Sequence, residues 1–143
     1  MFTINCARVR PEEEFVIPAA RIRGDAGLDL SVSRYAMVDK DQVAHLSTNV
    51  AVALPSGYYG LVLPRSSTLW RKGLYVSPGV IDNGYRGEVM IVVRNESGKP
   101  VVVQVGERVA QLLVLPLPAV RVAEIGALDK GTRGSAGFGS TGD

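Results

Sequence analysis

The chain consists of short apolar runs that turn residues interrupt at intervals of about 8–12 residues. Turn residues such as Asp39-Lys40-Asp41 and Pro55-Ser56-Gly57 separate the runs, and only residues 66–72 could form a helix, of about two turns. This pattern predicts an all-β fold, either a sandwich or a barrel. The expected strands cover residues 2–9, 35–38, 42–46, 48–54, 58–63, 101–105, 108–115 and 120–125.

The overall composition narrows the class of protein. With 143 residues the chain can form one domain with a buried core. Its net charge of +2 favours neither nucleic acid nor an anionic membrane, and no apolar run approaches the ~20 residues that cross a bilayer. A single cysteine, Cys6, excludes an internal disulfide and indicates a reducing compartment. The first residues lack the basic and apolar regions of a signal peptide, so we expect a cytoplasmic protein.

Residues 79–89 are typical of two short strands joined by a tight turn. Apolar residues lie on both sides of Asn83-Gly84, a strong signal for a hairpin turn. The same turn carries a carboxylate, Asp82, and an aromatic ring, Tyr85. Taken alone, the stretch fits an ordinary hairpin, but it also offers groups for chemistry.

A second stretch begins at Pro64 and presents Arg65, Ser66 and Ser67 at an expected helix start. Serine is a favoured N-cap residue, so simple capping explains the hydroxyl groups. The same geometry also suits an anion, because free N–H groups and the helix dipole attract negative charge and an arginine strengthens the contact with phosphate. Both interpretations stay open at this point.

Three further polar positions allow two interpretations each. Asp25 and Asp29 fit a solvated turn, or they could hold waters around a hard cation such as Mg²⁺. Gln111 lies among apolar neighbours, as either a satisfied core amide or a group that positions a ligand. The only histidine, His45, alternates with apolar residues, and no nucleophile-elbow, P-loop or dinucleotide motif is present.

The composition changes at residue 126. Six of the last eighteen residues are glycine, which is typical of a disordered tail. Arg133 and Phe138 lie among these glycines, however, and an arm with one cation and one aromatic ring could close over a ligand. We therefore expect a β-domain over residues 1–125 and a flexible arm over residues 126–143.

Taken together, five stretches of this chain resemble the trimeric dUTP pyrophosphatase (dUTPase) family, in the family's order. The matching stretches are Ala26-Gly27-Leu28-Asp29-Leu30, Pro64-Arg65-Ser66-Ser67, Gly79-Val80-Ile81-Asp82 with Tyr85-Arg86-Gly87, Gly106-Glu107-Arg108-Val109-Ala110-Gln111-Leu112, and residues 133–142. The resemblance implies a jelly-roll-like all-β barrel or sandwich and a homotrimer, which hydrolyses dUTP to dUMP and pyrophosphate with Mg²⁺. Each active site would combine residues of three chains, with the arm of one closing over a neighbour's nucleotide. Such an enzyme would limit uracil in DNA and supply dUMP for dTMP synthesis.

By the same resemblance, Asp82 would activate the water that attacks the α-phosphorus, and Gln111 would hold an active-site water. Tyr85 would lie under the deoxyribose and exclude a 2′-hydroxyl group. The metal, with its waters, would contact Asp29 and Asp25 indirectly. The remaining contacts implied with the nucleotide come from Gly79, Val80, Ile81 and Met90 at the base, Arg65, Ser66 and Ser67 at the phosphates, and Arg133, Phe138, Gly139 and Ser140 in the arm.

Two departures from the family pattern, two alternatives of the same fold and a third alternative without a nucleotide site accompany the resemblance. Ser67 and Ala136 stand where the family commonly has glycine, and the bulky Trp70 stands where small residues are usual. The related dCTP deaminases need a glutamate ten residues beyond the aspartate, where this chain has Val92. A regulatory or nucleotide-sensing trimer of the same fold is the second alternative. A β-sandwich without a nucleotide site would leave Arg133 and Phe138 without a role.

Overall fold

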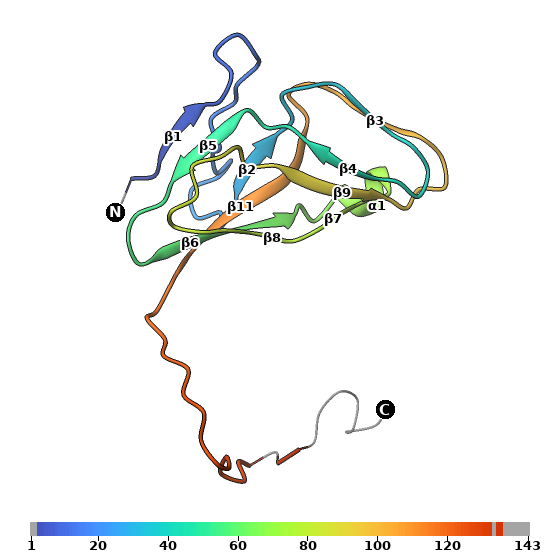
Figure 1. The fold of residues 1–143 in the computed structure, drawn as a ribbon. Helices are drawn as coiled ribbons and strands as arrows, with labels where there is room; N and C mark the ends of the chain where they lie inside the picture. Colours follow the sequence, from blue (N-terminus) through green and yellow to red (C-terminus); the bar gives the residue numbers. More distant parts are fainter. Residues whose placement is uncertain (1–2, 133, 136–143) are drawn as a thin grey trace.

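The computed structural model describes residues 3–132, 134 and 135, and this part of the chain is almost entirely β-structure (Figure 1). The strands are β1 (Asn5–Arg8), β2 (Leu28–Ser31), β3 (Ala36–Val38), β4 (Val43–Leu46), β5 (Val50–Ala53), β6 (Tyr58–Pro64), β7 (Leu74–Val76), β8 (Gly79–Ile81), β9 (Ile91–Asn95), β10 (Val101–Val103) and β11 (Arg108–Pro116), with helix α1 (Thr68–Lys72) between β6 and β7. The all-β prediction is confirmed. Among the described residues, no helix is long and apolar enough to span a membrane.

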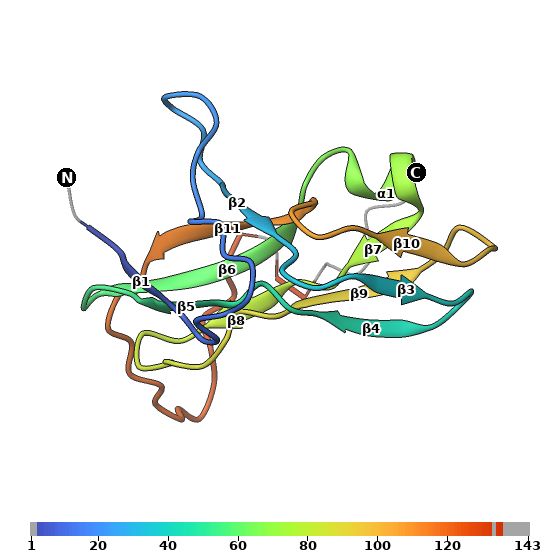
Figure 2. The ribbon, with the colours of Figure 1, turned by 90° about the horizontal axis from the view of Figure 1, so that it is seen from above.

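The strands pair into four antiparallel sheets that surround one core. The largest has the order β2-β11-β6-β8, a second has the order β4-β9-β7, and β1-β5 and β10-β3 form two-stranded pairs. Seen from above, α1, β3, β4, β7, β9 and β10 gather at one end and β1, β5 and β8 lie toward the other (Figure 2). The sheet order places β11 between β2 and β6, so residues of three separate stretches become neighbours.

Small branched side chains fill the core between the sheets. Alternation along β5 and β9 sends every second residue inward, so Val50, Val52, Ile91 and Val93 are buried. Leu112 of β11 is fully buried in the same cluster. Burial on this scale contributes roughly 1.5–3 kcal/mol for each such side chain, which holds the sheets together.

The hairpin expected over residues 79–93 does not form. β8 pairs with β6, and β9 pairs with β4 and β7, so the two strands belong to different sheets. A turn does form where expected, because the Tyr85 N–H donates to the Asp82 carbonyl oxygen at 3.0 Å, but Gly84 does not adopt positive φ. The type I′ hairpin turn needs positive φ at both central residues. Residues 82–90, here called the crossover segment, therefore carry the chain from one sheet to the other.

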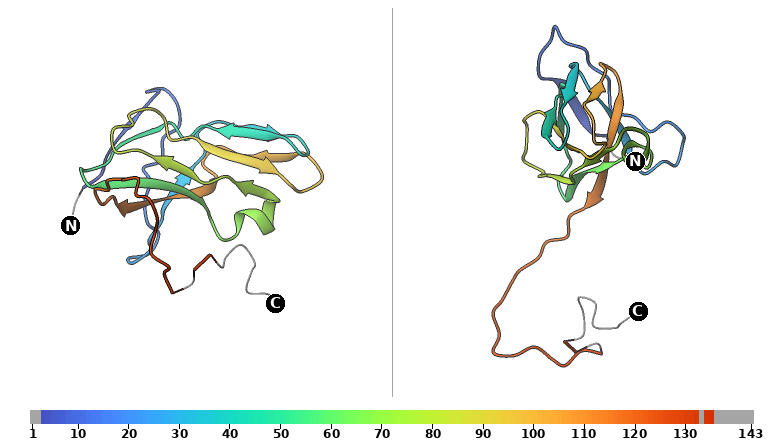
Figure 3. Two further views of the ribbon diagram at one scale, coloured as in Figure 1. Left: turned by 60° about the horizontal axis from the view of Figure 1, so that its bottom comes forward. Right: turned by 90° about the vertical axis from the view of Figure 1, so that its right-hand side faces the viewer.

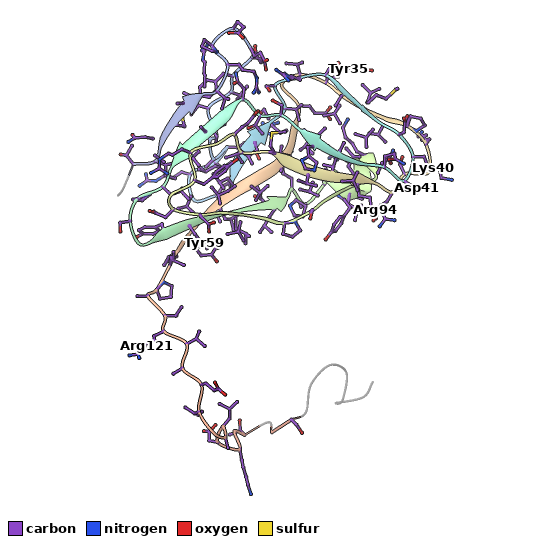
Figure 4. The ribbon with its side chains drawn as sticks, in the orientation of Figure 1. Tyr35, Lys40, Asp41, Tyr59, Arg94 and Arg121 are labelled. Carbon is purple, nitrogen blue, oxygen red and sulfur yellow. The ribbon has the colours of Figure 1, made fainter. Side chains whose placement is uncertain are left out.

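The strand expected over residues 120–125 is also absent. After β11 the chain leaves the body and extends away from it (Figures 1 and 3). Val120 and Val122 are 82% and 94% exposed, and Arg121 lies well clear of the body (Figure 4). The alternating pattern is present there, but a strand also needs a neighbour. Within the described residues, no partner strand lies beside this segment.

Candidate functional site

Two clefts contain most of the polar residues that the sequence singled out. The first, here called the arginine cleft, has a volume of about 290 Å³. Its lining residues are Arg21, Asp25, Ala26, Gly27, Asp29, Arg65, Ser66 and Gln111. It lies where the start of β2, the end of β6 and the middle of β11 meet, because β11 pairs with both of the other strands.

Asp29 binds two arginine side chains at the arginine cleft. Arg65 Nε donates to Asp29 Oδ1 at 2.8 Å, and Arg108 NH1 donates to Asp29 Oδ2 at 3.1 Å. The carboxylate is largely shielded, with 15% of its side chain exposed. One carboxylate therefore orients two guanidinium groups, and the group as a whole keeps one excess positive charge for an anionic ligand.

Gln111 is fixed by its neighbours on both sides. It stands opposite Asp29 on β2 and Leu63 on β6, and its Nε2 donates to the Pro64 carbonyl oxygen at 2.9 Å. Gly27 lies against its amide so closely that a Cβ there would collide with the amide oxygen. The absence of a side chain at residue 27 thus leaves the space that the Gln111 amide occupies. Gln111 is half-buried and lines the arginine cleft, so it is not a fully buried core amide.

The two serines at the start of α1 line the hollows on either side of Arg65, Ser66 in the arginine cleft and Ser67 in the hollow next to it. Ser67 occupies the N-cap position but makes no side-chain cap hydrogen bond to the helix, so the simple capping interpretation is wrong. Ser66 is exposed in the arginine cleft beside Arg65. A further hollow of about 290 Å³ continues from Arg65 past Arg71 and Lys72, which extends the cationic surface along α1.

The second cleft, here called the aspartate cleft, has a volume of about 310 Å³. It is lined by Gly79, Val80, Ile81, Asp82, Tyr85, Glu88 and Met90. Six of these seven were predicted as site residues and come together here. Asp82 is exposed at the mouth of the cleft.

The turn that carries Asp82 is held to the body by Asn83. Its Nδ2 lies 3.1 Å from the Leu54 carbonyl oxygen, 2.6 Å from that of Pro55 and 3.3 Å from that of Tyr58. These carbonyl groups belong to the loop between β5 and β6 and to the first residue of β6. Asp82 is therefore fixed at the Tyr58 end of β6.

Glu88 is the residue of the aspartate cleft that sequence reasoning missed. Its carboxylate accepts hydrogen bonds from Arg10, Ser47 Oγ and the Asn49 N–H. Burial opposes ionisation of this group, but the bonds from Arg10, Ser47 and Asn49 prevail and lower the pKa of Glu88 to about 2. The sequence does contain a signal for this residue: Glu88 directly precedes the apolar run of residues 89–93. A charge at the start of a buried strand requires a partner, so its position indicates an ion pair.

Arg65 of the arginine cleft and Asp82 of the aspartate cleft lie toward opposite ends of β6. Arg65 follows Pro64 at one end, whereas the Asp82 turn is bound to Tyr58 at the other. Six residue steps at about 3.3 Å each separate Tyr58 and Pro64 by roughly 20 Å. The structure therefore brings the predicted residues together in two groups and does not join these groups within one chain. Arg133, Phe138, Gly139 and Ser140 lie outside the described residues.

The described residues include no group of three or more His, Cys, Asp or Glu side chains that could bind a metal ion directly. Both Asp29 oxygens accept from arginines, and Asp25 Oδ2 accepts from the Ile22 N–H at 3.0 Å. Asp25 is exposed and keeps oxygen lone pairs for water. This donor set suits contact with a hydrated cation through its waters.

Comparisons with known proteins agree on one family. The dUTPase family model matches residues 13–142. A deoxyuridine 5'-triphosphate nucleotidohydrolase from Gloeobacter violaceus is 40% identical over 132 residues, which cover 90% of each chain. The enzyme of the same name from Mycobacterium marinum is 40% identical over 146 residues, and the match covers 96% of this chain and 95% of the Mycobacterium marinum chain. The Staphylococcus bacteriophage 80alpha dUTPase, solved with dUPNHPP, has the same fold, with a TM-score of 0.90 at 24% identity over the whole of both chains.

Proposed function

The chain belongs to the dUTPase family, and we propose that it hydrolyses dUTP to dUMP and pyrophosphate. One observation carries the proposal: the chain presents a cationic cleft suited to a triphosphate and a separate cleft with a carboxylate, an aromatic ring and strand backbone suited to a nucleoside. The relatives named for this activity match the chain across both clefts.

The separation of roughly 20 Å along β6 between the position of Arg65 and that of Asp82 argues for an enzyme whose sites are shared between chains. Asp82 is proposed to act at the α-phosphorus and Arg65 at the phosphate groups beside it, so the two residues of one site must lie closer together than Arg65 and Asp82 of one chain do along β6. In a cyclic homotrimer, the arginine cleft of one subunit meets the aspartate cleft of the next, so three complete sites form. The arm over residues 126–143 would then come from the third subunit.

In the proposed reaction, Asp82 of the aspartate cleft is the general base. The Asp82 carboxylate accepts a proton from a water molecule while the water oxygen bonds to the α-phosphorus. The bond between the α-phosphorus and the bridging oxygen breaks, and pyrophosphate leaves with the electron pair. Gln111, fixed against Gly27 and Pro64, holds a water in the arginine cleft of the other subunit.

The walls of the aspartate cleft select the nucleoside. β8 is an edge strand of its sheet, so its backbone at Gly79, Val80 and Ile81 can hydrogen-bond to the edge of uracil as a partner strand would. Tyr85 lies against the deoxyribose and excludes a 2′-hydroxyl group, and Met90 completes the wall.

The arginine cleft binds the phosphate groups. Arg65, oriented by Asp29, makes charge-assisted contacts with phosphate oxygens, and Ser66 and Ser67 donate through their hydroxyl groups. In the arm, Arg133 binds the γ-phosphate, Phe138 stacks on uracil, and Gly139 and Ser140 contact the nucleotide.

A Mg²⁺ ion fits this arrangement when it is bound to the triphosphate. The ion would neutralise charge on the phosphate groups and orient them. Asp25 and Asp29 would contact it through water, in agreement with their hydrogen bonds to Ile22, Arg65 and Arg108. In the cytoplasm, such an enzyme would limit uracil in DNA and supply dUMP for dTMP synthesis.

The two alternatives have weaker support. Deamination of dCTP needs a carboxylate at residue 92, and Val92 is a half-buried apolar residue opposite His45 on β4. A regulatory trimer would not need Gln111 held so tightly in the arginine cleft. Release of pyrophosphate from dUTP, dCTP, dTTP and UTP with Mg²⁺ tests the proposal. We expect pyrophosphate release from dUTP alone. If a folded trimer released no pyrophosphate from any of the four nucleotides, the regulatory alternative would be favoured.

A further inference from the structure

Glu88 has no part in the reaction proposed above, yet it is the most strongly bonded side chain of the aspartate cleft. Its side chain is 14% exposed and its two oxygens accept four hydrogen bonds. Arg10 NH1 and NH2 donate at 2.9 and 2.8 Å, Ser47 Oγ at 2.5 Å and the Asn49 N–H at 2.7 Å. Charge-assisted bonds of this kind, with a bidentate arginine, are among the strongest in proteins.

The partners of Glu88 are themselves fixed. Ser47 and Asn49 are 8% and 0% exposed, in the connection between β4 and β5. Asn49 Oδ1 accepts from the Arg10 N–H at 2.7 Å, so it binds the arginine's own backbone. Arg10 Nε also lies 2.7 Å from Glu13 Oε2, as an ion pair outside the geometry of a directed hydrogen bond. The Glu88 carboxylate is thus anchored to a rigid part of the body.

The backbone of Glu88 in turn holds Tyr85. Tyr85 Oη donates to the Glu88 carbonyl oxygen at 3.0 Å. The ring folds back over Gly87, where a Cβ would lie 2.6 Å from Tyr85 Cζ. The next residue is bound too, because the Val89 N–H donates to the Val50 carbonyl oxygen at 2.7 Å. The position of the Tyr85 ring therefore depends on where the Glu88 backbone is held.

We propose that Glu88, anchored by Arg10, is a positioning residue that sets the depth of Tyr85 in the aspartate cleft and thereby the discrimination between deoxyribose and ribose. The inference rests on the proposed function, in which Tyr85 lies against the sugar. With the anchor intact, the crossover segment cannot withdraw from the cleft, and the ring leaves no room for a 2′-hydroxyl group. Without the anchor, the Glu88 carbonyl group and the ring move together, and ribose gains access.

The test compares kcat and KM for dUTP and UTP in the whole protein and in Glu88→Gln. We expect the dUTP-to-UTP ratio of kcat/KM to fall about tenfold, mainly through a lower KM for UTP, with kcat for dUTP within about threefold of the unmodified value. The Tyr85→Ala variant shows how much discrimination between dUTP and UTP is lost when the ring is absent. That loss is the upper limit for the effect of Glu88→Gln.

Arg34→Ala is the matched control. Arg34 binds Glu13 in the same network, with Arg34 Nε donating to Glu13 Oε2 at 2.9 Å, but it is 58% exposed and does not bind Glu88. We expect this variant to keep its sugar discrimination. If Glu88→Gln does not fold, Arg10→Gln removes the same anchor from the other side and should give the same fall.

The outcomes separate the inference from the proposed function. An unmodified protein that releases no pyrophosphate from dUTP refutes the proposed function and the inference with it. An active unmodified protein whose Glu88→Gln and Arg10→Gln variants keep the discrimination of Arg34→Ala refutes the inference alone. If both variants lose discrimination, the double variant should lose no more than either one, because the two residues act as one anchor.

Discussion

Substitution of Gly27 by alanine tests whether the Gln111 amide must occupy its observed place. An added Cβ would lie 2.8 Å from Gln111 Cδ and 3.1 Å from Gln111 Cβ, and it would collide with the amide oxygen. The amide group must therefore rotate away and lose its 2.9 Å bond to the Pro64 carbonyl oxygen. Loss of that bond costs about 1 kcal/mol of folding free energy, or a fall of roughly 2–5 °C in Tm.

The effect on activity should be larger than the effect on stability. Displacement of a positioning group by about 1 Å commonly costs up to ~10² in rate, so we expect kcat to fall roughly 10- to 100-fold. Steady-state release of pyrophosphate from dUTP measures kcat, and thermal unfolding at one protein concentration measures stability. Gly84→Ala, where an added methyl group meets nothing within 4 Å, is the stability control.

A double-mutant cycle identifies the cause of the loss. If Gly27→Ala acts through the Gln111 amide, it should cost almost nothing more in a Gln111→Ala background, since the colliding group is gone. A kcat for Gly27→Ala within twofold of the unmodified enzyme, or equal losses in both backgrounds, would refute this reasoning.

Three further predictions concern the base, the arm and the Glu88 carboxylate. Asp82→Asn should keep nucleotide binding but lose roughly 10²–10⁴ in kcat, because the amide cannot accept the proton, and near-normal turnover would exclude Asp82 as the base. Truncation after Gly131 should leave a folded protein with little activity, whereas full activity would exclude a role for the arm in closing the site. The pKa of Glu88 is lowered from its usual value near 4.5 to about 2, so its stabilising contribution is fully present above pH 4.5 and is lost as the pH falls toward 2. Acid unfolding should therefore show a loss of stability over this range that is smaller in Glu88→Gln, and equal slopes in the two proteins would contradict the assignment.

The sequence predicted which residues form strands better than it predicted which strands pair. The apolar run after residue 90 became β9, as expected, but its neighbours are β4 and β7 and not β8. Asn83-Gly84 correctly signalled a turn, because turn chemistry is local. Partner choice depends on contacts far along the chain, which local patterns do not contain.

The same distinction between local and distant contacts applies to the site. The sequence correctly predicted that Asp82, Tyr85 and the strand before them share one cleft, because these residues are close in sequence. The pairing of Asp29 with Arg108 and of Arg10 with Glu88 joins residues 79 and 78 positions apart, and no spacing rule indicates such pairs. The strand expected over residues 120–125 failed for the converse reason, since its pattern is correct but no partner strand lies beside it in the described chain.

The central claim is that each active site combines the arginine cleft of one subunit with the aspartate cleft of another. Mixing inactive Arg65→Ala and Asp82→Asn proteins, unfolding them together and refolding them tests it directly. In randomly assembled trimers, about one quarter of the sites would combine an intact Arg65 with an intact Asp82, so about a quarter of the unmodified activity should return. If both residues of a site came from one chain, every site would lack one of them, and activity no greater than that of the separate variants would contradict the claim.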